Sequence, residues 1–347
     1  MKELIDKLER CHTLSRDEFQ QVLSCDDEYL FERARLTAHK VYGNAVFVRG
    51  LIEISNYCKN NCYYCGLRAD NVKAQRYRLK KKDILACCNN GYVLGFRSFV
   101  LQSGEDPCYS DAVLDDIISE IKKLFPDCAL TLSLGERSYL SYERLFNAGA
   151  DRYLLRHETA NEQHYEMLHP DTMSCAIRKQ CLYDLKKIGY QTGCGIMVGS
   201  PGQTPDHIID DLIFIKELQP HMAGIGPFIP HSDTPFKHHE AGSIQLTLNI
   251  LAILRLMQPS LLIPATTALN TLDVNGREKG ILAGANVIMP NLSPAQARKK
   301  YMPYDNKIST GNEAAESIAE LQSSLARIGY EILMSRGDYL EMKNESF

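Results

Sequence analysis

The sequence predicts a single α/β domain, a full (β/α)8 barrel of the TIM type with a helical cap at its amino terminus. Two observations predict this fold. Short β-type runs alternate with amphipathic helical stretches along most of the chain, and no linker, repeat or low-complexity segment interrupts them. A length of 347 residues is enough for one such barrel. A six-stranded open barrel or a doubly wound sheet remains the alternative, because weak runs such as 286–290 are easily miscounted.

The predicted elements follow in order. Residues 1–44 form a helical extension in which Ser15 is an N-cap and Gly43 a helix stop. Residues 45–347 form the barrel and a C-terminal closing segment, with the active site inside the barrel at its C-terminal mouth. The eight predicted strands are 45–55, 98–102, 129–134, 152–156, 191–198, 222–228, 261–266 and 286–290. Helical stretches between them include 111–125, 141–150, 176–189 and 206–219.

Composition limits the cellular location and the kinds of partner that we expect for this protein. The formal net charge of −4 argues against a broad nucleic-acid footprint, and no apolar run is long enough to span a bilayer. The amino terminus carries charges and no apolar signal core. Twelve cysteines without a secretion signal indicate reduced thiols or metal ligands rather than disulfides. We therefore expect a cytoplasmic protein with neither a nucleic-acid nor a membrane partner.

Three cysteines lie close together after the first predicted strand, in the stretch CKNNCYYCGLR. Cys58, Cys62 and Cys65 are spaced so that one irregular loop can wrap a 4Fe–4S cubane and ligate three of its irons. The fourth iron is then open to a small molecule. The alternatives are a zinc ion with a distant fourth ligand, or three ordinary buried cysteines.

This cysteine spacing, with the aromatic Tyr64 just before the third cysteine, resembles the radical S-adenosylmethionine superfamily. Other stretches lie at the strand ends where that superfamily binds its cofactor: QSGEDP (102–107), GIMVGSPGQT (195–204) and GPFIPH (226–231). The resemblance implies that the open iron binds the amino and carboxylate groups of the methionine moiety. It also implies that one electron from the reduced cluster cleaves the sulfonium to give a 5′-deoxyadenosyl radical.

Seven extended stretches resemble the HydE family of iron–iron hydrogenase maturases. They are NCYYCGLR, LQSGEDP, TLSLGE, RYLLRHETAN, GIGPFIPH, PATTALN and GANVIMPN. The resemblance implies a role in assembling the two-iron subcluster of the hydrogenase H-cluster. The substrate implied is a small iron-containing or cysteine-derived molecule whose sulfur the radical attacks. An electron donor and other hydrogenase maturases are the implied partners.

Residue roles follow from the chemistry and from the resemblance. Arg156 and Glu158 share the parity of one strand end, so both can face the barrel interior, whereas His157 points toward the helices. A simple Arg156–Glu158 charge pair is the alternative. The resemblance assigns cofactor binding to Tyr64, Gln102, Ser103, Glu105, Glu158, Arg178 and Ile229. It assigns substrate binding to Thr131, Arg156, Thr266, Thr267, Ala268, Tyr301 and Tyr304, although the two tyrosines could equally be surface loop residues. Met222 and Met289, at strand ends, are predicted to line the substrate cavity as soft apolar walls, with ordinary core positions as the alternative.

The segment PATTALN offers hydroxyl and backbone N–H donors to an anion, although Thr266 and Thr267 could equally cap a turn. No cysteine follows Cys194, so an accessory cluster held by C-terminal cysteines cannot form. The run SFVLQSG also lacks a cysteine, which disfavours sulfur insertion of the biotin synthase type. A methylornithine synthase-like enzyme and a non-enzymatic iron–sulfur carrier remain alternatives. An amino-acid substrate would require an inward-facing acid for its ammonium group.

Overall fold

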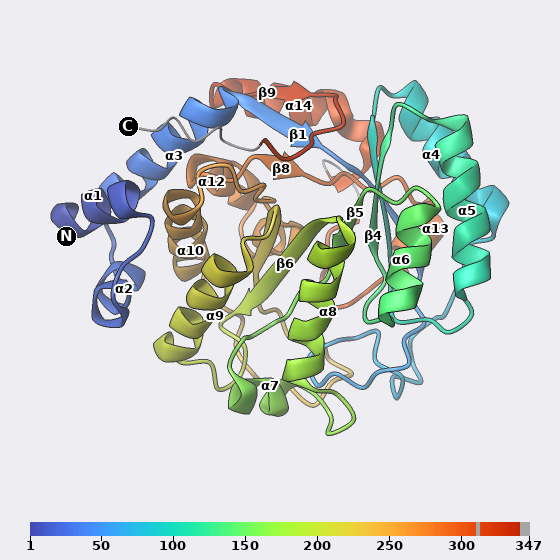
Figure 1. The fold of residues 1–347 in the computed structure, drawn as a ribbon, viewed down its shortest axis with the longest axis horizontal. Helices are drawn as coiled ribbons and strands as arrows, with labels where there is room; N and C mark the ends of the chain where they lie inside the picture. Colours follow the sequence, from blue (N-terminus) through green and yellow to red (C-terminus); the bar gives the residue numbers. More distant parts are fainter. Residues whose placement is uncertain (310–312, 341–347) are drawn as a thin grey trace.

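Parallel strands surround the interior of the molecule in a computed structural model that describes residues 1–309 and 313–340 (Figure 1). Within this described part, six strands form one sheet in the order β2-β3-β4-β5-β6-β7, and three short strands form a second in the order β8-β1-β9. The six strands are β2 (Gly50–Ser55), β3 (Ser98–Ser103), β4 (Ala129–Ser133), β5 (Arg152–Leu154), β6 (Gln191–Val198) and β7 (Met222–Pro227). The three are β1 (Ala45–Val48), β8 (Val287–Ile288) and β9 (Glu331–Leu333).

Helices cover the outer face of the strands (Figure 1). The longer ones are α4 (Lys81–Val93), α5 (Asp111–Leu124), α6 (Tyr139–Asn147), α8 (Cys175–Ile188), α9 (Pro205–Leu218) and α10 (Ile244–Met257). Side chains of Ser110, Ser138, Ser174, Thr204 and Ser243 cap five of them. The shorter helices are α7 (Glu162–Leu168), α11 (Thr267–Leu272), α12 (Gly276–Leu282) and α13 (Ala295–Arg298), and α14 (Ile318–Arg327) precedes β9. The predicted helices after β3, β4, β5 and β6 are thereby confirmed.

Three further helices at the amino terminus lie beside α10: α1 (Lys2–Cys11), α2 (Arg16–Leu23) and α3 (Glu28–Tyr42). Ser15 caps α2 in a reciprocal capping box with Glu18, and Gly43 ends α3 at φ 61°, as predicted. The Asn249 side chain of α10 donates hydrogen bonds to the carbonyls of Leu23 and Cys25, at 3.0 and 2.8 Å. These bonds anchor the helical cap to the body of the protein.

The full eight-stranded barrel predicted from the sequence is not shown, because the regular sheet of the described residues has six strands. The predicted strand 261–266 makes only isolated parallel bridges, at Leu262 and Pro264, and 286–290 shortens to the two residues of β8. Proline has no N–H to donate to a ladder, so Pro264 and Pro290 interrupt regular pairing in both segments.

One other strand prediction was wrong in detail, and one strand was not predicted. The predicted first strand is divided at Arg49 into β1 and β2, which belong to different sheets. The sequence also gave no signal for β9, which pairs with β1 from the far end of the chain. No helix among the described residues has the length and apolar character needed to cross a membrane.

Candidate active site and cluster-binding loop

A cavity of about 360 Å³ lies at the carboxyl ends of the strands. Barrel enzymes build their active sites at this end, because the loops that follow the strands converge there. Thirteen of the residues predicted for the site line this cavity: Tyr64, Cys65, Gln102, Ser103, Arg156, Glu158, Ile229, Thr266, Thr267, Ala268, Met289, Tyr301 and Tyr304. Segments far apart in the sequence therefore line one cavity.

Two predicted substrate residues lie elsewhere. Thr131 and Met222 line a separate space of about 10 Å³, near the amino-terminal ends of β5, β6 and β7. The Arg49 guanidinium points into this space, and its Nη1 is 2.9 Å from the Met222 sulfur. The structure therefore does not bring Thr131 and Met222 together with the other predicted substrate residues.

The cysteine loop between β2 and α4 is held in shape by hydrogen bonds from the Arg76 side chain to its backbone. Arg76 donates hydrogen bonds to four carbonyls of the loop, those of Asn56, Leu67, Arg68 and Asn71, at 2.5–3.2 Å. The Asn60 N–H points at the Cys58 sulfur from 3.4 Å, which would stabilise a thiolate there. A Cβ at Gly104 would clash with Tyr57 and Cys58, so only glycine lets the turn after β3 pack against the loop.

The three thiols suit a cluster better than a single ion. All twelve cysteines lie in the described part and all are free. Burial, then the neighbouring Cys58, raises the pKa of Cys65 to about 12, and burial likewise raises the pKa of Cys58 and Cys62. Thiolates in such a site require a compensating metal charge. Among the described residues no group of three His, Cys, Asp or Glu side chains converges on one ion. Thiols that each bind a different iron of a cubane need not converge in that way.

Arg156 and Glu158 follow β5 and face the cavity, as their parity predicted. The Arg156 Nη2 lies 3.0 Å from the Glu158 carboxylate and 2.7 Å from the Ile196 carbonyl. Glu158 has φ 65°, an uncommon backbone conformation for a residue with a side chain, and such strain is typical of functional sites. His157 points outward and packs edge-on against Phe214 of α9, as predicted.

Arg178 and Glu105 lie behind the cavity wall. The Arg178 Nε is 2.6 Å from the carboxylate of Glu136, and its Nη2 is 3.8 Å from Glu105. Glu105 accepts a hydrogen bond from the Glu136 N–H at 2.9 Å and lies 3.3 Å from the Lys59 ammonium. Burial raises the pKa of Glu136, and the Arg178 charge opposes that rise. Sequence reasoning missed Glu136, although it is the last residue of the stretch TLSLGE, just after a strand end.

The two threonines at the end of the predicted seventh strand differ in the contacts that they make. The Thr267 hydroxyl donates a hydrogen bond of 2.8 Å to Glu313. The Thr266 hydroxyl is buried with no hydrogen-bond partner among the described residues. It lies 3.0 Å from the position that a Cβ would occupy on Gly226, so glycine keeps the space in front of it open. Thr266 is therefore the free donor at this wall of the cavity.

Two buried ion pairs in the cavity wall were not anticipated. Glu53 pairs with Lys307, and Glu313 pairs with Arg277. Burial raises the pKa of Glu53, and Lys307 opposes the rise. The sequence contained one sign of these pairs, because Glu53 is the single charged residue in the apolar strand GLIEIS. Lys307 and Glu313 lie in the closing segment and carried no signal.

A parallel sheet with a three-thiol loop at its carboxyl ends defines a radical S-adenosylmethionine enzyme, and the model of the Radical SAM superfamily matches residues 52–215. Such enzymes use a 4Fe–4S cluster and S-adenosylmethionine. The chain is 47% identical over 311 residues to the FeFe hydrogenase maturase subunit HydE of Thermotoga maritima, covering 88% of each chain. The chain belongs to the HydE family.

More distant relatives share the fold. The 3-methylornithine synthase of Methanosarcina acetivorans is 29% identical over 311 residues, covering 88% of this chain and 87% of the relative. A crystal structure of methylornithine synthase superposes with a TM-score of 0.81 at 25% identity, covering 95% of this chain and 97% of the other.

Proposed function

We propose that the protein is a maturase that acts in assembling the two-iron subcluster of the FeFe-hydrogenase H-cluster. The observation that carries this proposal is the 47% identity to a HydE maturase over 88% of both chains. Thirteen predicted site residues around one cavity support it. We further propose that the protein acts in the cytoplasm, with an external electron donor and other hydrogenase maturases as partners.

Cys58, Cys62 and Cys65 are the residues that would hold the 4Fe–4S cluster. When bound, the cluster and S-adenosylmethionine supply a 5′-deoxyadenosyl radical. The chain's own part is to position the cofactor. In this proposal Gln102, Ser103 and Glu105 bind its amino end, Arg178 its carboxylate, Glu158 its ribose or amine, and Tyr64 and Ile229 flank it. The left-handed backbone at Glu158, held by a hydrogen bond from its N–H to the Gly195 carbonyl, would aim that carboxylate.

The opposite wall of the cavity would bind the substrate, a small iron-containing or cysteine-derived molecule. Arg156 and the unpaired Thr266 hydroxyl offer donors to a carboxylate or cyanide group. Thr267 would act through Glu313, with Ala268, Met289, Tyr301 and Tyr304 closing the space. Enclosure by these side chains would keep water away from the reacting atoms of the bound substrate. Thr131 and Met222, in their separate space, would act on the substrate only indirectly.

Two structural proposals accompany the function. Residues 1–44 would form a helical extension, and residues 45–347 one domain whose end, 341–347, lies outside the described residues. Segments 261–266 and 286–290, which pair irregularly, would complete a closed barrel of eight strands around the cavity. Parallel bridges support this closure: Met222 to Leu262, Pro264 to Val287, and Leu51 to Asn291.

A methylornithine synthase-type rearrangement is the second candidate, favoured by the 29% identity to that enzyme. Its amino-acid substrate would need an acid in the cavity, and Glu53 and Glu313 both line it. Each of these acids is already paired with a cation, Lys307 or Arg277. The pairing leaves little negative charge for an ammonium group and favours the anionic substrate.

The test is a pair of assays on one anaerobic preparation. With dithionite, the protein should cleave S-adenosylmethionine slowly to methionine and 5′-deoxyadenosine. Added to the other maturases, it should be required for activation of hydrogenase in vitro. Conversion of lysine to methylornithine would establish the second candidate instead. Failure to cleave the cofactor at all, with the cluster intact, would contradict both.

A further inference from the structure

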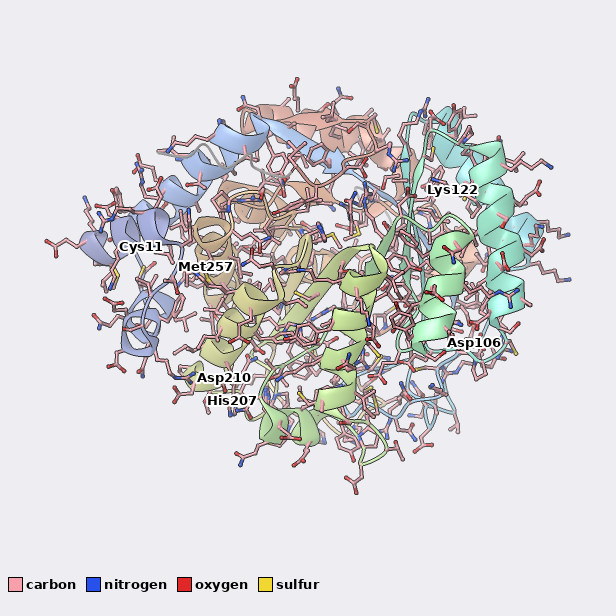
Figure 2. All side chains as sticks on the ribbon, in the orientation of Figure 1. Cys11, Asp106, Lys122, His207, Asp210 and Met257 are labelled. Atoms are coloured by element: carbon pink, nitrogen blue, oxygen red, sulfur yellow. The ribbon has the colours of Figure 1, made fainter. Side chains whose placement is uncertain are left out.

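A fully buried acid of α9 lies behind the turn that carries Glu158. This residue, Asp211, belongs to the second turn of α9 and directly follows the Asp210 labelled in Figure 2. Asp210 is paired with Arg16 at 2.7 Å. The one ion-pair contact of Asp211 in the described part of the chain is with His157, at 3.6 Å. A carboxyl group buried away from any close Lys or Arg is unfavourable, so its place in the fold requires a reason.

Asp211 and His157 hold the chain on both sides of Glu158. The Asp211 carboxylate accepts a hydrogen bond from the Ala160 N–H. The His157 Nδ1 accepts one from the Gly195 N–H at 3.4 Å, and the Gly195 carbonyl accepts the Glu158 N–H at 3.0 Å. The turn between residues 157 and 160 is therefore held at one end by α9 and at the other end by β6.

A third contact holds the same turn from α8. The Lys179 ammonium donates a hydrogen bond of 2.6 Å to the Ala160 carbonyl. Both polar groups of the Ala160 backbone are thus bound by side chains, from two different helices. Surrounding contacts of this kind can maintain a backbone conformation that a residue otherwise avoids, and Glu158, with φ 65°, has such a conformation.

Burial suppresses the charges of Asp211 and His157. It raises the pKa of Asp211 well above its usual value and lowers the pKa of His157 to about 3. Both shifts favour the neutral side chains, because a low-dielectric environment disfavours charge. Since Nδ1 accepts from Gly195, the neutral His157 carries its proton on Nε2, which faces Asp211. Two neutral side chains suit the apolar layer beneath α9, where Phe214 packs edge-on against the His157 ring.

We propose that Asp211, together with His157, is a positioning residue that holds Glu158 in its left-handed conformation and so aims the Glu158 carboxylate into the cavity. The inference rests on the cofactor role proposed for Glu158. Asp211 and His157 are not among the residues that line the cavity, so they act through Glu158 and do not touch S-adenosylmethionine. Their loss should weaken cofactor binding while the cluster stays in place.

The test compares two changes at Asp211 with a control elsewhere between the sheet and its helices. Asp211→Leu removes the acceptor of the Ala160 N–H, and Asp211→Asn keeps an acceptor on a neutral side chain of the same shape. The control, Tyr190→Phe, removes a buried hydrogen bond of 2.8 Å from the Tyr190 hydroxyl to the Tyr142 carbonyl. Hydrogen exchange, read by mass spectrometry, follows the Glu158 amide in the protein without cofactor. Equilibrium dialysis gives the affinity of the cluster-loaded protein for S-adenosylmethionine.

We expect Asp211→Leu to exchange the Glu158 amide about tenfold faster and to bind the cofactor about tenfold more weakly. Asp211→Asn should stay within about threefold of wild type in both measurements. Tyr190→Phe should lower the free energy of unfolding but leave both measurements within about twofold. Because the effect on the cofactor passes through Glu158, Asp211→Leu/Glu158→Gln should bind it at most about twofold more weakly than Glu158→Gln alone.

The proposal is overturned if the two losses of affinity multiply in the double variant, if Tyr190→Phe loses as much affinity as Asp211→Leu, or if Asp211→Leu changes neither measurement. If Asp211→Leu does not retain its cluster, His157→Phe, which keeps a ring against Phe214, decides by the same measurements. Suppose that the Glu158 amide exchanges faster in Asp211→Leu, yet Glu158→Gln binds the cofactor normally. That result contradicts the cofactor role proposed for Glu158 and leaves the positioning role of Asp211 standing.

Discussion

Arg178 is a buried cation held between two glutamates behind the cavity. Glu136 is its nearest partner at 2.6 Å, and Glu105 lies at 3.8 Å. Removing one partner of a buried ion pair leaves the other charge uncompensated. The role proposed for Arg178, holding the cofactor carboxylate, can therefore be separated from a purely structural role by changing each member of the pair.

Arg178→Gln should weaken S-adenosylmethionine binding by about 1.5–3 kcal/mol, the scale of a hydrogen bond to a charged group. Glu136→Gln should keep cofactor affinity, because it removes a competing anion rather than the donor. Equilibrium dialysis on cluster-loaded protein measures both. If Arg178→Gln binds the cofactor normally with its iron content intact, the assignment is wrong.

Thr266 and Thr267 provide a second comparison between single residues. Thr266→Val removes a buried hydroxyl without a partner, so the free energy of unfolding should change by less than about 0.5 kcal/mol. Hydrogenase maturation should nevertheless fall while uncoupled cofactor cleavage persists. Thr267→Val should lower the free energy of unfolding by about 1–3 kcal/mol, because Glu313 loses a donor.

Chemical denaturation and in vitro maturation measure these two effects. If the Thr266→Val variant matures hydrogenase at the normal rate, the substrate does not bind at Thr266. The same experiment on Arg156→Gln extends the test to the other proposed anion donor.

At the scale of elements, the loop between β2 and α4 carries the three cluster ligands. Its shape depends on Arg76, whose guanidinium hydrogen-bonds four carbonyls from within the loop. Carbonyls that accept from a charged donor lose strong bonds when the donor is removed. The loop should therefore hold its cluster less firmly without Arg76, even though no ligand is changed.

Anaerobic reconstitution should give about four irons per chain in one cubane, and Ala at Cys58, Cys62 or Cys65 should abolish it. Arg76→Met should still bind the cluster but release iron to a chelator faster than wild type, as followed by absorbance. Arg68→Met is the matched control, since among the described residues that guanidinium makes one ion-pair contact, with Asp70 at 3.7 Å. Eight irons per chain, or one zinc ion, would contradict the proposal that each chain holds a single 4Fe–4S cluster.

At the scale of the whole molecule, the carboxyl ends of the strands are open to the cavity and the amino ends are closed by the C-terminal segment. β9 pairs with β1, and Asp338 contacts Arg152 of β5 at 2.5 Å. The Arg152 side chain is only 3% exposed, so Asp338 compensates a buried charge. Arg336 is bound to Asp151 and Asp338, each at 2.9 Å, and ties the same segment to the loop before β5.

Asp338→Asn should lower the free energy of unfolding by about 2 kcal/mol, a value below that of a fully buried pair because Asp338 is partly exposed. Asp115→Asn, which breaks an exposed pair with Arg144, should cost less than about 1 kcal/mol. Despite partial burial, hydrogen bonds and charge from Arg336 and Arg152 lower the pKa of Asp338 from 3.8 to about 2. Its contribution is thus complete above pH 4 and is lost as the pH falls toward 2.

Urea denaturation of both variants near pH 7 measures the two costs. Equal costs for Asp338→Asn and Asp115→Asn would show that the closing segment does not depend on the buried charge of Arg152.

The sequence by itself determined the features that depend on neighbours within a few residues. Helix caps such as Ser15, the parity of Arg156 and Glu158, and the spacing of Cys58, Cys62 and Cys65 are local, because propensity, side-chain direction and loop reach act over short stretches. The alternation of strands and helices followed from the same local periodicity, which is why the order of elements was predictable.

Only the tertiary structure decided the contacts between distant segments. Glu53 pairs with Lys307, 254 residues further along the chain, and Thr267 donates a hydrogen bond to Glu313, 46 residues further along. Strand β1 pairs with β9 and belongs to a different sheet from β2, which follows it directly in the sequence. Whether Thr266 or Thr267 keeps a free hydroxyl, and whether Thr131 reaches the cavity, depends on how the strands close around one interior. The free energy of such contacts comes from burial and pairing that exist only once the chain has folded, so no local pattern encodes them.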